Sequence, residues 1–453
     1  MGSTFTVINP TTATAVREVP RHSVEEVDRI IAGAARAFET WRAVAPGDRA
    51  RLLRRFAAVV DGHIEELAQL EVANAGHTIG NARWEAGNVR DVLNYYSAAP
   101  ERLFGRQIPA PNGLDVTFKE PLGVIGIIVP WNFPMPIAGW GFGPALAAGN
   151  TVVLKPAEIT PLTALRLGEL ALEAGIPEGV FNVVTGSGSV VGDRFVTHPL
   201  VRKLVFTGST EVGKSIMRGA ADQVKPVTLE LGGKSANIIF ADSDLERAAA
   251  TAPYGVFDNA GQDCCARSRI LVQSSAYERF MERLEVAVKG VRVEDPALDS
   301  SEMGPLVTRS HFDHVAEYLE GANVAFRGNK PAGPGFWMEP HVLVSDGTDR
   351  CFKEEIFGPV VSVMRFDDEA DAIRIANDSI YGLSGSIWTN DLGRAIRVAR
   401  AVEAGNLSVN SHSSVRYWTP FGGYKQSGLG RELGPDALDA FTETKNVFFD
   451  TQH

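Results

Sequence analysis

The chain has 453 residues, of which 44% are hydrophobic and 22% are charged, as in ordinary folded proteins. This length exceeds the size at which one hydrophobic core stops growing, so we expect two or more packed units. The formal charge of −11 at pH 7 argues against nucleic-acid binding, and no apolar run is long enough to predict a membrane span.

The first predicted elements along the chain are helices. Residues Ser23 to Glu26 have the pattern of a capping box, and apolar side chains at helical spacing follow as far as Trp41. A second helix is predicted from one apolar stripe, which consists of Leu53, Phe56, Val60, Ile64 and Leu67.

After residue 115, short apolar runs rich in β-branched residues alternate with helical segments. This alternation predicts βαβ units and parallel sheets. The first series of runs is 123–129, 151–154, 181–184, 204–206 and 227–231, and the second begins near Ala236 and continues at 269–273, 359–364, 385–388 and 406–409. We therefore predict an α/β fold with two doubly wound, Rossmann-like domains.

Two turns that contain glycine follow predicted strands. In residues 186–192 the third glycine comes one residue too late for the dinucleotide fingerprint, so this signal is weak. Gly208 and Gly213 mark the two ends of a turn that opens a helix, where backbone N–H groups could hold a pyrophosphate. An ordinary tight turn fits that local sequence equally well.

The three cysteines, Cys264, Cys265 and Cys351, are odd in number and two of them are neighbours, which is not a disulfide framework. The pattern predicts a reducing, cytoplasmic setting. Cys264 follows a polar loop that contains glycine, which makes it a candidate nucleophile. A lone cysteine is more often a small buried hydrophobic residue, so the assignment depends on its surroundings.

The histidines do not have metal-ligand spacing. His311 and His314 lie three residues apart, but this spacing fits a solvated helix face better than a metal site. We therefore expect no metal.

The assignment of Cys264 is supported by seven motifs along the chain: PWNFP at 130–134, KPAE at 155–158, FTGS at 206–209, LELGGK at 229–234, GQDC at 261–264, EEIFGP at 354–359 and PFGGYKQSGLGRE at 420–432. Their order and approximate spacing resemble the aldehyde dehydrogenase superfamily, and the resemblance runs from about residue 5 to the C-terminus. It implies an NAD(P)-dependent enzyme that oxidises an aldehyde to a carboxylic acid.

By this resemblance, Cys264 is the nucleophile that attacks the aldehyde carbon and then carries a thioester. Asn132 would donate its amide, together with the backbone N–H of Cys264, to the developing oxyanion. Glu230 would activate the water that hydrolyses the thioester.

The resemblance also implies where the coenzyme binds. Lys155 and Glu158 would hold the adenosine ribose, Ser209 would face the pyrophosphate, and Glu355 would hold the nicotinamide ribose beside Phe357. A carboxylate at residue 158 favours NAD, although NADP is also possible. The full set implied in coenzyme binding is Trp131, Lys155, Glu158, Gly208, Ser209, Gly213, Glu355 and Phe357.

The positions that resemble a substrate tunnel are mostly aromatic: Phe133, Ile137, Trp140, Asp263, Cys265, Tyr417, Trp418 and Phe421. Asp263 slightly favours an aminoaldehyde, because a carboxylate attracts a cationic tail. Two alternatives stay open: Asp263 bonded to the loop backbone, and Arg416 selecting an aldehyde with a carboxylate tail.

By resemblance, residues 1–111 and 123–231 form a cofactor-binding domain and residues 232–432 a catalytic domain. A small β oligomerisation element would join residues 112–122 to residues 433–453. A homodimer or homotetramer is expected, with a small-molecule aldehyde as partner. An acylating enzyme is disfavoured because Glu230 is present. A silent binding protein is disfavoured because the thiol, the oxyanion donor and the base are all retained.

Overall fold

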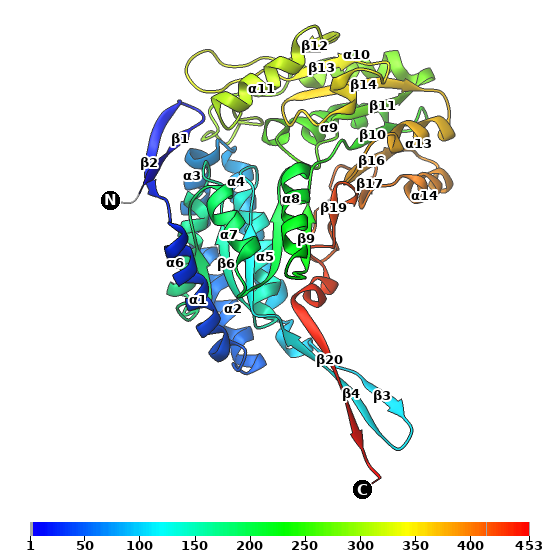
Figure 1. The fold of residues 1–453 in the computed structure, drawn as a ribbon. Helices are drawn as coiled ribbons and strands as arrows, with labels where there is room; N and C mark the ends of the chain where they lie inside the picture. The colour runs from blue at the N-terminus through cyan, green and yellow to red at the C-terminus, as the bar shows by residue number, and fades with distance from the viewer. Residues whose placement is uncertain (1–2, 414, 453) are drawn as a thin grey trace.

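The computed structural model describes residues 3–413 and 415–452. The chain builds two open α/β sheets stacked end to end and a long antiparallel arm that projects from the lower one (Figure 1). The predicted α/β class with two doubly wound sheets and a small strand-built element is confirmed. Within the described residues no helix combines the length and the apolar character needed to cross a bilayer.

The first sheet has the strand order β19-β9-β8-β5-β6-β7. Its core strands are parallel, and only β19 runs antiparallel to its neighbour. The strands are β5 (Val124–Ile128), β6 (Thr151–Lys155), β7 (Phe181–Val183), β8 (Val201–Thr207), β9 (Val227–Glu230) and β19 (Gly428–Leu429). All five strands predicted for this region are present, with small differences at their ends.

Helices cover both faces of the first sheet (Figure 1). They are α1 (Val24–Trp41), α2 (Pro46–Gly62), α3 (Ile64–Ala75), α4 (Ile79–Ser97), α5 (Pro134–Ala147), α6 (Leu162–Glu173), α7 (Asp193–Thr197) and α8 (Thr210–Ala221). Alternate residues of β5 point to opposite cores: Val124 and Ile128 pack with α1, and Ile125 and Ile127 pack with α2 and α5.

The predicted capping box is present, because Ser23 accepts the N–H of Glu26 and the Glu26 side chain accepts the N–H of Ser23. The prediction of one second helix is wrong. α2 ends at Gly62, His63 leaves helical geometry, and α3 begins at Ile64. The apolar stripe continues across this break because both helices pack on the same core.

The second sheet has the order β12-β13-β14-β11-β10-β16-β17, with β12 as an antiparallel edge. Its strands are β10 (Ala236–Ile239), β11 (Arg269–Gln273), β12 (Val324–Arg327), β13 (His341–Val344), β14 (Val360–Phe366), β16 (Ser384–Trp388) and β17 (Asn406–Val409). The helices are α9 (Leu245–Phe257), α10 (Tyr277–Lys289), α11 (Arg309–Leu319), α12 (Arg350–Lys353), α13 (Glu369–Asn377) and α14 (Leu392–Ala401).

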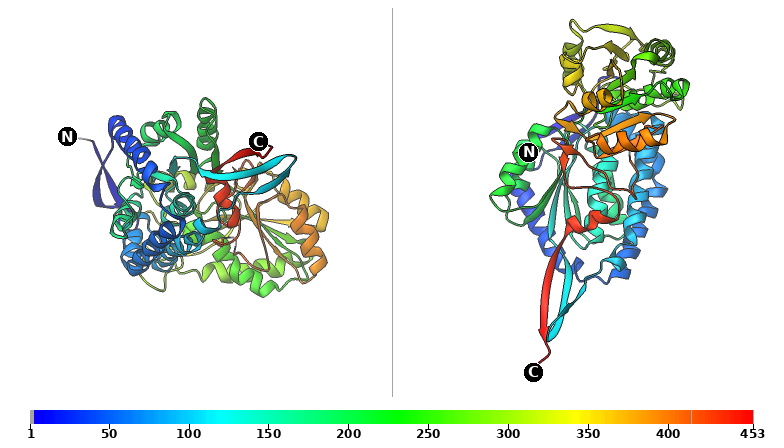
Figure 2. Two further views of the ribbon diagram at one scale, coloured as in Figure 1. Left: turned by 90° about the horizontal axis from the view of Figure 1, so that it is seen from below. Right: turned by 90° about the vertical axis from the view of Figure 1, so that its right-hand side faces the viewer.

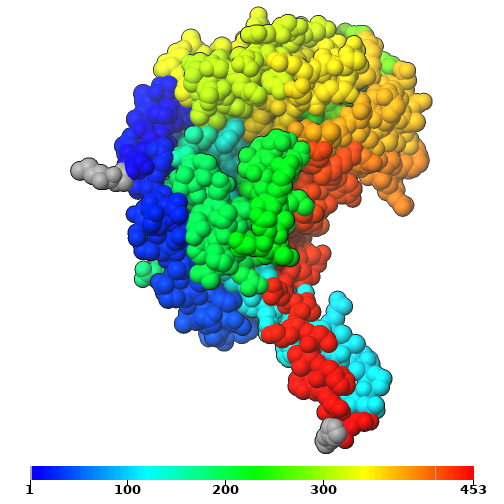
Figure 3. All heavy atoms as spheres, in the orientation of Figure 1, coloured from blue at the N-terminus to red at the C-terminus, as the bar shows by residue number. Residues whose placement is uncertain are grey.

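The arm is a three-stranded antiparallel sheet in which β4 (Gly113–Pro121) pairs with both β3 (Gln107–Ala110) and β20 (Thr442–Asp450). It stands clear of the rest of the molecule in two perpendicular views (Figures 1 and 2) and as a separate projection in Figure 3. Large apolar side chains on it are exposed, among them Phe118, Phe448 and Phe449. The sheet begins before residue 112, since β3 belongs to it.

Smaller elements complete the chain. The hairpin of β1 (Thr4–Asn9) and β2 (Thr14–Pro20) lies at the N-terminus, and β15 (Tyr381–Gly382) pairs with β18 (Tyr424–Lys425). Short helical segments are η1 (Pro100–Arg102), η2 (Gly188–Gly192), η3 (Asp258–Gly261), η4 (Ser274–Ala276) and η5 (Pro435–Phe441). The weak glycine signal at 186–192 therefore coincides with a π-helical turn that leads into α7.

Candidate active site

The candidate site lies where the first sheet meets the second. The carboxyl ends of β5, β8 and β9 in the first sheet face the segments that precede β11 and β14 in the second. The chain crosses from β9 to β10 through residues 231–235 and returns to the first sheet at β19. The strand order reverses between β5 and β8, which is where a doubly wound sheet binds ligands.

The loop that carries Cys264 has an unusual backbone. Three successive residues, Asn259, Ala260 and Gly261, have φ of 50°, 56° and 71°, in the left-handed region. A Cβ on Gly261 would lie 2.0 Å from the carbonyl oxygen of Gly358, so this position requires glycine. The Asn259 amide donates to the backbone oxygen of Asn132 at 2.7 Å, which ties the loop to the end of β5.

The Cys264 thiol is partly exposed to the site and is held in its neutral form. Hydrogen bonding to Cys265 and burial raise the pKa of Cys264 well above its ordinary value, and the charges of Asp263 and Glu355 act in the same direction. Gly233 has no side chain at the point where the crossing segment approaches this loop, and a Cβ there would lie 2.3 Å from the Cys264 carbonyl oxygen. A proton acceptor is therefore needed before the thiol can act as a nucleophile.

Glu230 ends β9, and its carboxyl group is buried. Neither of its oxygens has a hydrogen-bond partner among the described residues. Burial raises its pKa well above the ordinary value, and the nearby Glu432 carboxylate adds to the rise. Burial also raises the pKa of Glu432 to about 8, opposed by Lys203. Both carboxyl groups therefore favour the protonated state near neutral pH.

Asn132 lies in the short segment between β5 and α5 and is buried. Its amide donates to the backbone oxygen of Gln262 at 3.0 Å, which places the amide group beside the loop that ends at Cys264. The backbone N–H of Cys264 donates to no acceptor in residues 3–413 and 415–452. The Asn132 amide and the Cys264 backbone N–H are thus two donors that lie at the loop carrying the thiol.

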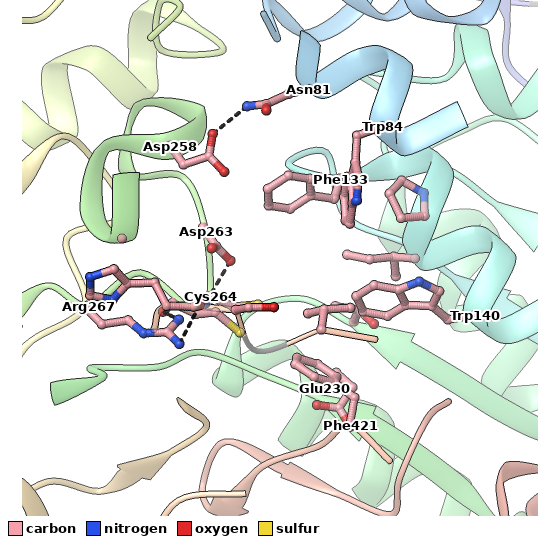
Figure 4. A pocket seen from close by; sticks show the side chains of 18 of the residues that line it. Asn81, Trp84, Phe133, Trp140, Glu230, Asp258, Asp263, Cys264, Arg267 and Phe421 are labelled. Carbon is pink, nitrogen blue, oxygen red and sulfur yellow. Dashed lines mark hydrogen bonds between the residues drawn. The ribbon is translucent and has the colours of Figure 1, made fainter. Parts of the chain in front are cut away.

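A cavity of about 320 Å³ brings most of the expected substrate residues together around Cys264 and Glu230. Figure 4 shows Cys264 in the middle, Glu230 and Phe421 below it, and Phe133 and Trp140 across the cavity from Asp263. The predicted residues that line it are Phe133, Ile137, Trp140, Glu230, Asp263, Cys264, Cys265 and Phe421.

Tyr417 and Trp418 line a neighbouring cavity instead, together with Arg416. Tyr417 packs on Tyr95 and Trp418, with ring centroids 5.6 Å and 4.6 Å apart, and this packing holds it away from Cys264. Asp263 accepts the backbone N–H of Cys265 at 2.8 Å, which is one of the alternatives left open by the sequence.

The coenzyme positions lie along the carboxyl edge of the first sheet. Ser209 caps α8 by accepting the N–H of Val212, and Gly213 packs α8 against Leu231, where a Cβ would lie 2.5 Å from a side-chain carbon. Gly208 donates its N–H to the Glu230 carbonyl oxygen. The Thr207 hydroxyl lines the cavity, is buried, and has no partner among the described residues, so it can bond a ligand.

Lys155 ends β6, and burial lowers its pKa to about 8, with Glu158 opposing the change. Its ammonium group donates to the Pro156 carbonyl oxygen. Glu158 is half-buried and forms an ion pair with Arg21, at the end of the N-terminal hairpin, which donates to it at 2.8 Å. The Glu355 carboxylate accepts the N–H of Gly233 at 2.7 Å, and burial raises its pKa to about 7.

The expectation of a solvated helix face is wrong for His311. Its ring lies 5.1 Å from Trp131, and its Nε2 lies 2.7 Å from the carbonyl oxygen of Phe357. A carbonyl only accepts, so Nε2 carries the proton. Phe357 has φ of 61°, which is rare for an aromatic residue, and its ring lies 5.3 Å from Trp131.

Sequence reasoning missed several residues of the cavity. Thr207 ends β8 within the motif at 206–209 but was given no role. The others have no local pattern that marks them and come from α4, α9, the segments on either side of Cys264 and the segment after β17: Asn81, Trp84, Tyr254, Asp258, Arg267, His412 and Val415. Two groups also have a geometry that could hold a metal ion, namely Asp263 with Cys264 and Cys265, and the buried Glu71, His77 and Glu85.

The Aldehyde dehydrogenase family model matches residues 1–447. The chain belongs to the aldehyde dehydrogenase family. It is 42% identical to an aldehyde dehydrogenase from Emericella nidulans over 99% of this chain and 92% of that protein. It is 41% identical to a cytosolic 10-formyltetrahydrofolate dehydrogenase from Xenopus laevis, over 98% of this chain but 51% of that longer protein.

Solved structures of the family superpose closely. A betaine aldehyde dehydrogenase from Staphylococcus aureus, in complex with NAD+, matches with a TM-score of 0.97 and 38% identity over 100% of this chain and 92% of that chain. Members of the family are oxidoreductases that act on aldehydes, which agrees with the enzyme class predicted from the motifs.

Proposed function

We propose that the protein oxidises an aldehyde to a carboxylic acid through a thioester on Cys264, with NAD as the hydride acceptor. The observation that carries the proposal is that Glu230, at the end of β9, and Cys264, in the loop before β11, line one cavity. The Asn132 amide donates to the loop that carries Cys264. A nucleophile, a base and an oxyanion donor in one enclosed site suit acyl chemistry.

The Cys264 sulfur forms a bond to the aldehyde carbon, and the carbonyl oxygen becomes an oxyanion. The Asn132 amide and the Cys264 backbone N–H donate hydrogen bonds to this oxygen, where negative charge develops. Since the pKa of Cys264 is raised, the thiol proton has to leave before or during the attack.

When bound, NAD supplies the hydride acceptor that converts the thiohemiacetal to a thioester. The Glu230 carboxylate then takes a proton from water as the water oxygen bonds to the thioester carbon. The carbon–sulfur bond breaks, which releases the acid and leaves Cys264 as a thiolate. Glu230 must first ionise despite its raised pKa, and Glu432 lies close enough to affect that ionisation.

The residues present fit a dinucleotide. The turn from Gly208 to Gly213 opens helix α8, a 12-residue helix whose first-turn N–H groups suit a pyrophosphate. The unpartnered Thr207 hydroxyl faces the cavity nearby. We propose that Lys155 and Glu158 hold the adenosine ribose and Glu355 the nicotinamide ribose, with Trp131 and Phe357 as packing surfaces. Glu158 favours NAD over NADP, because a carboxylate repels a 2′-phosphate.

The proposal includes the domain division made from the sequence: a cofactor-binding domain (1–111 and 123–231), a catalytic domain (232–432) and an oligomerisation element (112–122 and 433–453). We amend it at two strands: β3 joins the oligomerisation element, because it pairs with β4, and β19 joins the cofactor-binding domain, because it pairs with β9. The exposed Phe118, Phe448 and Phe449 on the projecting arm support a role in forming a homodimer or homotetramer. The three free cysteines suit a cytoplasmic protein.

The substrate class that we propose is an aldehyde with a cationic tail, an aminoaldehyde. Asp263 lines the cavity with Cys264, and Arg416, which would favour a carboxylate tail, lies on the neighbouring cavity.

NADH fluorescence with a panel of aliphatic, aromatic, amino- and carboxy-aldehydes tests the activity. We expect NADH and free acid with at least one aldehyde, without coenzyme A. If turnover requires coenzyme A, the enzyme transfers the acyl group to coenzyme A and does not hydrolyse the thioester. If no aldehyde gives NADH, the result favours a binding protein.

A further inference from the structure

The cavity around Cys264 has carboxyl groups on two sides. Glu230 lies below Cys264 in Figure 4, and Asp258 lies above it, close to Asp263. Asp258 and Asp263 each raise the pKa of Tyr254, so these three side chains share one end of the cavity. This end is the one farther from Glu230.

Asp263 is already compensated by its surroundings. Its carboxylate accepts the N–H of Cys265 at 2.8 Å, and the Arg267 guanidinium lowers its pKa against the effect of burial. Arg267 itself is fixed to the protein, because it donates to the carbonyl oxygens of Cys265 and His412 at 2.7 Å and 3.0 Å. It is therefore not placed to bind a carboxylate tail.

Asp258 lacks such compensation. It is partly buried, and no lysine or arginine forms an ion pair with it in the part of the chain that the structure describes. The nearby His77 has a pKa lowered by burial, so it is neutral at pH 7. Burial raises the pKa of Asp258 to about 6, so its carboxylate is ionised above neutral pH. A partly buried carboxylate that lines a cavity and has no cation beside it can pair favourably with a cationic ligand.

Two further side chains define the geometry of this end. Asn81 on α4 donates to Asp258 Oδ1 at 2.5 Å and fixes the carboxylate, which keeps acceptor capacity for other donors. Trp84, also on α4, lies across the cavity from Asp258 beside Phe133 (Figure 4). An indole face attracts cations.

We propose that Asp258, with Asp263 and Trp84, forms a subsite for a positively charged nitrogen at the end of the substrate remote from its aldehyde group. The inference rests on the proposed function and assigns the cationic tail chiefly to Asp258, which sequence reasoning did not identify. The subsite requires a positive charge, which both a primary and a quaternary ammonium group carry. Only the primary ammonium group also donates hydrogen bonds.

Matched pairs of substrates test the charge alone. β-Aminopropanal is compared with butanal, and trimethylammonioacetaldehyde with its neutral carbon isostere. We expect a higher kcat/KM for at least one cationic member than for its neutral partner, and the pair that shows it identifies the kind of nitrogen. Asp258→Asn should reduce this preference about 10- to 100-fold, the usual effect of losing a hydrogen bond to a charged group.

Asp91→Asn is the matched control. Asp91 lines the neighbouring cavity and pairs with Arg90, so this variant loses the same charge without changing the Cys264 cavity. Its preference should equal that of the wild type. Equal kcat/KM for both members of each pair, or an unchanged preference in Asp258→Asn, would overturn the subsite.

Inhibition of the wild-type enzyme gives a reading that does not depend on a variant folding. With butanal as substrate, propylammonium should inhibit competitively at lower concentration than propanol. The advantage of propylammonium should shrink as pH falls from 8 to 5 through the pKa of Asp258. The other titratable groups that interact with Asp258 are Asp263, Tyr254, His77 and Glu85. Equal inhibition at pH 8 would contradict the proposal, whereas no NADH with any aldehyde would contradict the proposed function instead.

Discussion

Replacing Glu230 by glutamine separates the two half-reactions of the proposed mechanism. Thioester formation requires the Cys264 thiolate, the Asn132 donor and bound NAD, whereas hydrolysis also requires a base at residue 230. Neither oxygen of Glu230 has a partner among the described residues, so the amide breaks no hydrogen bond. It also removes a carboxyl group that lies close to Glu432, so the fold should tolerate the change.

General-base catalysis contributes about 10²- to 10⁴-fold, so hydrolysis should slow by that factor in Glu230→Gln. We expect a burst of up to about one NADH per site, followed by a slow steady state, which is the kinetic signature of an accumulating covalent intermediate. Because the pKa of Cys264 is raised, the burst should be faster at pH 9 than at pH 7.

Stopped-flow fluorescence measures the burst, and mass spectrometry of quenched enzyme detects the acyl adduct. Glu71→Gln is a suitable control, since Glu71 is also a buried glutamate with a raised pKa but does not line the cavity. Steady turnover near the wild-type rate would refute the assignment of Glu230. Loss of both phases at pH 9, in a folded variant that binds NAD, would show that Glu230 deprotonates Cys264 instead.

Three further predictions concern other residues. Cys264→Ser should abolish NADH formation while Cys265→Ser keeps most of it, and an active Cys264→Ser enzyme would contradict the thioester mechanism. The kcat/KM for NAD should exceed that for NADP. Removal of the Arg21 guanidinium beside Glu158 should increase the ratio of the two values about two- to five-fold, the range of an exposed ion pair. A smaller ratio in Arg21→Ala than in the wild type would count against this role of Glu158. The pKa of Glu71 is raised from 4.5 to about 8, so its stabilising effect is complete below pH 4.5 and is lost as pH rises through 8. The melting temperature should therefore fall between pH 5 and 9, less steeply in Glu71→Gln, and equal slopes would exclude this assignment.

Much of the fold follows from local pattern, since buried parallel strands are short apolar runs rich in β-branched residues. The strand β13 was not predicted, because its four residues, His341–Val344, begin with a polar side chain and follow a proline. The break between α2 and α3 was not predicted either, because an apolar stripe reports the buried face and not the continuity of the helix.

The candidate site was predictable where its residues belong to motifs and not where tertiary packing decides. Cys264, Glu230 and Asn132 lie in three motifs, and the structure brings them together. Asp258 has no motif, and only the left-handed turn after it and the position of Asn81 direct it into the cavity. Tyr417 is aromatic like the residues of the cavity around Cys264, but it packs on Tyr95 and lines the neighbouring cavity instead.

The pairing of β19 with β9 has a mechanical consequence. The chain enters the second sheet after Glu230 and returns at Gly428, and these two residues are register partners. The whole upper unit is therefore inserted between two adjacent strands, and both of its chain connections to the lower sheet lie side by side at Glu230. A substitution that weakens the pairing of Gly428 with Glu230 would therefore disturb the proposed base and the attachment of the upper unit at the same time.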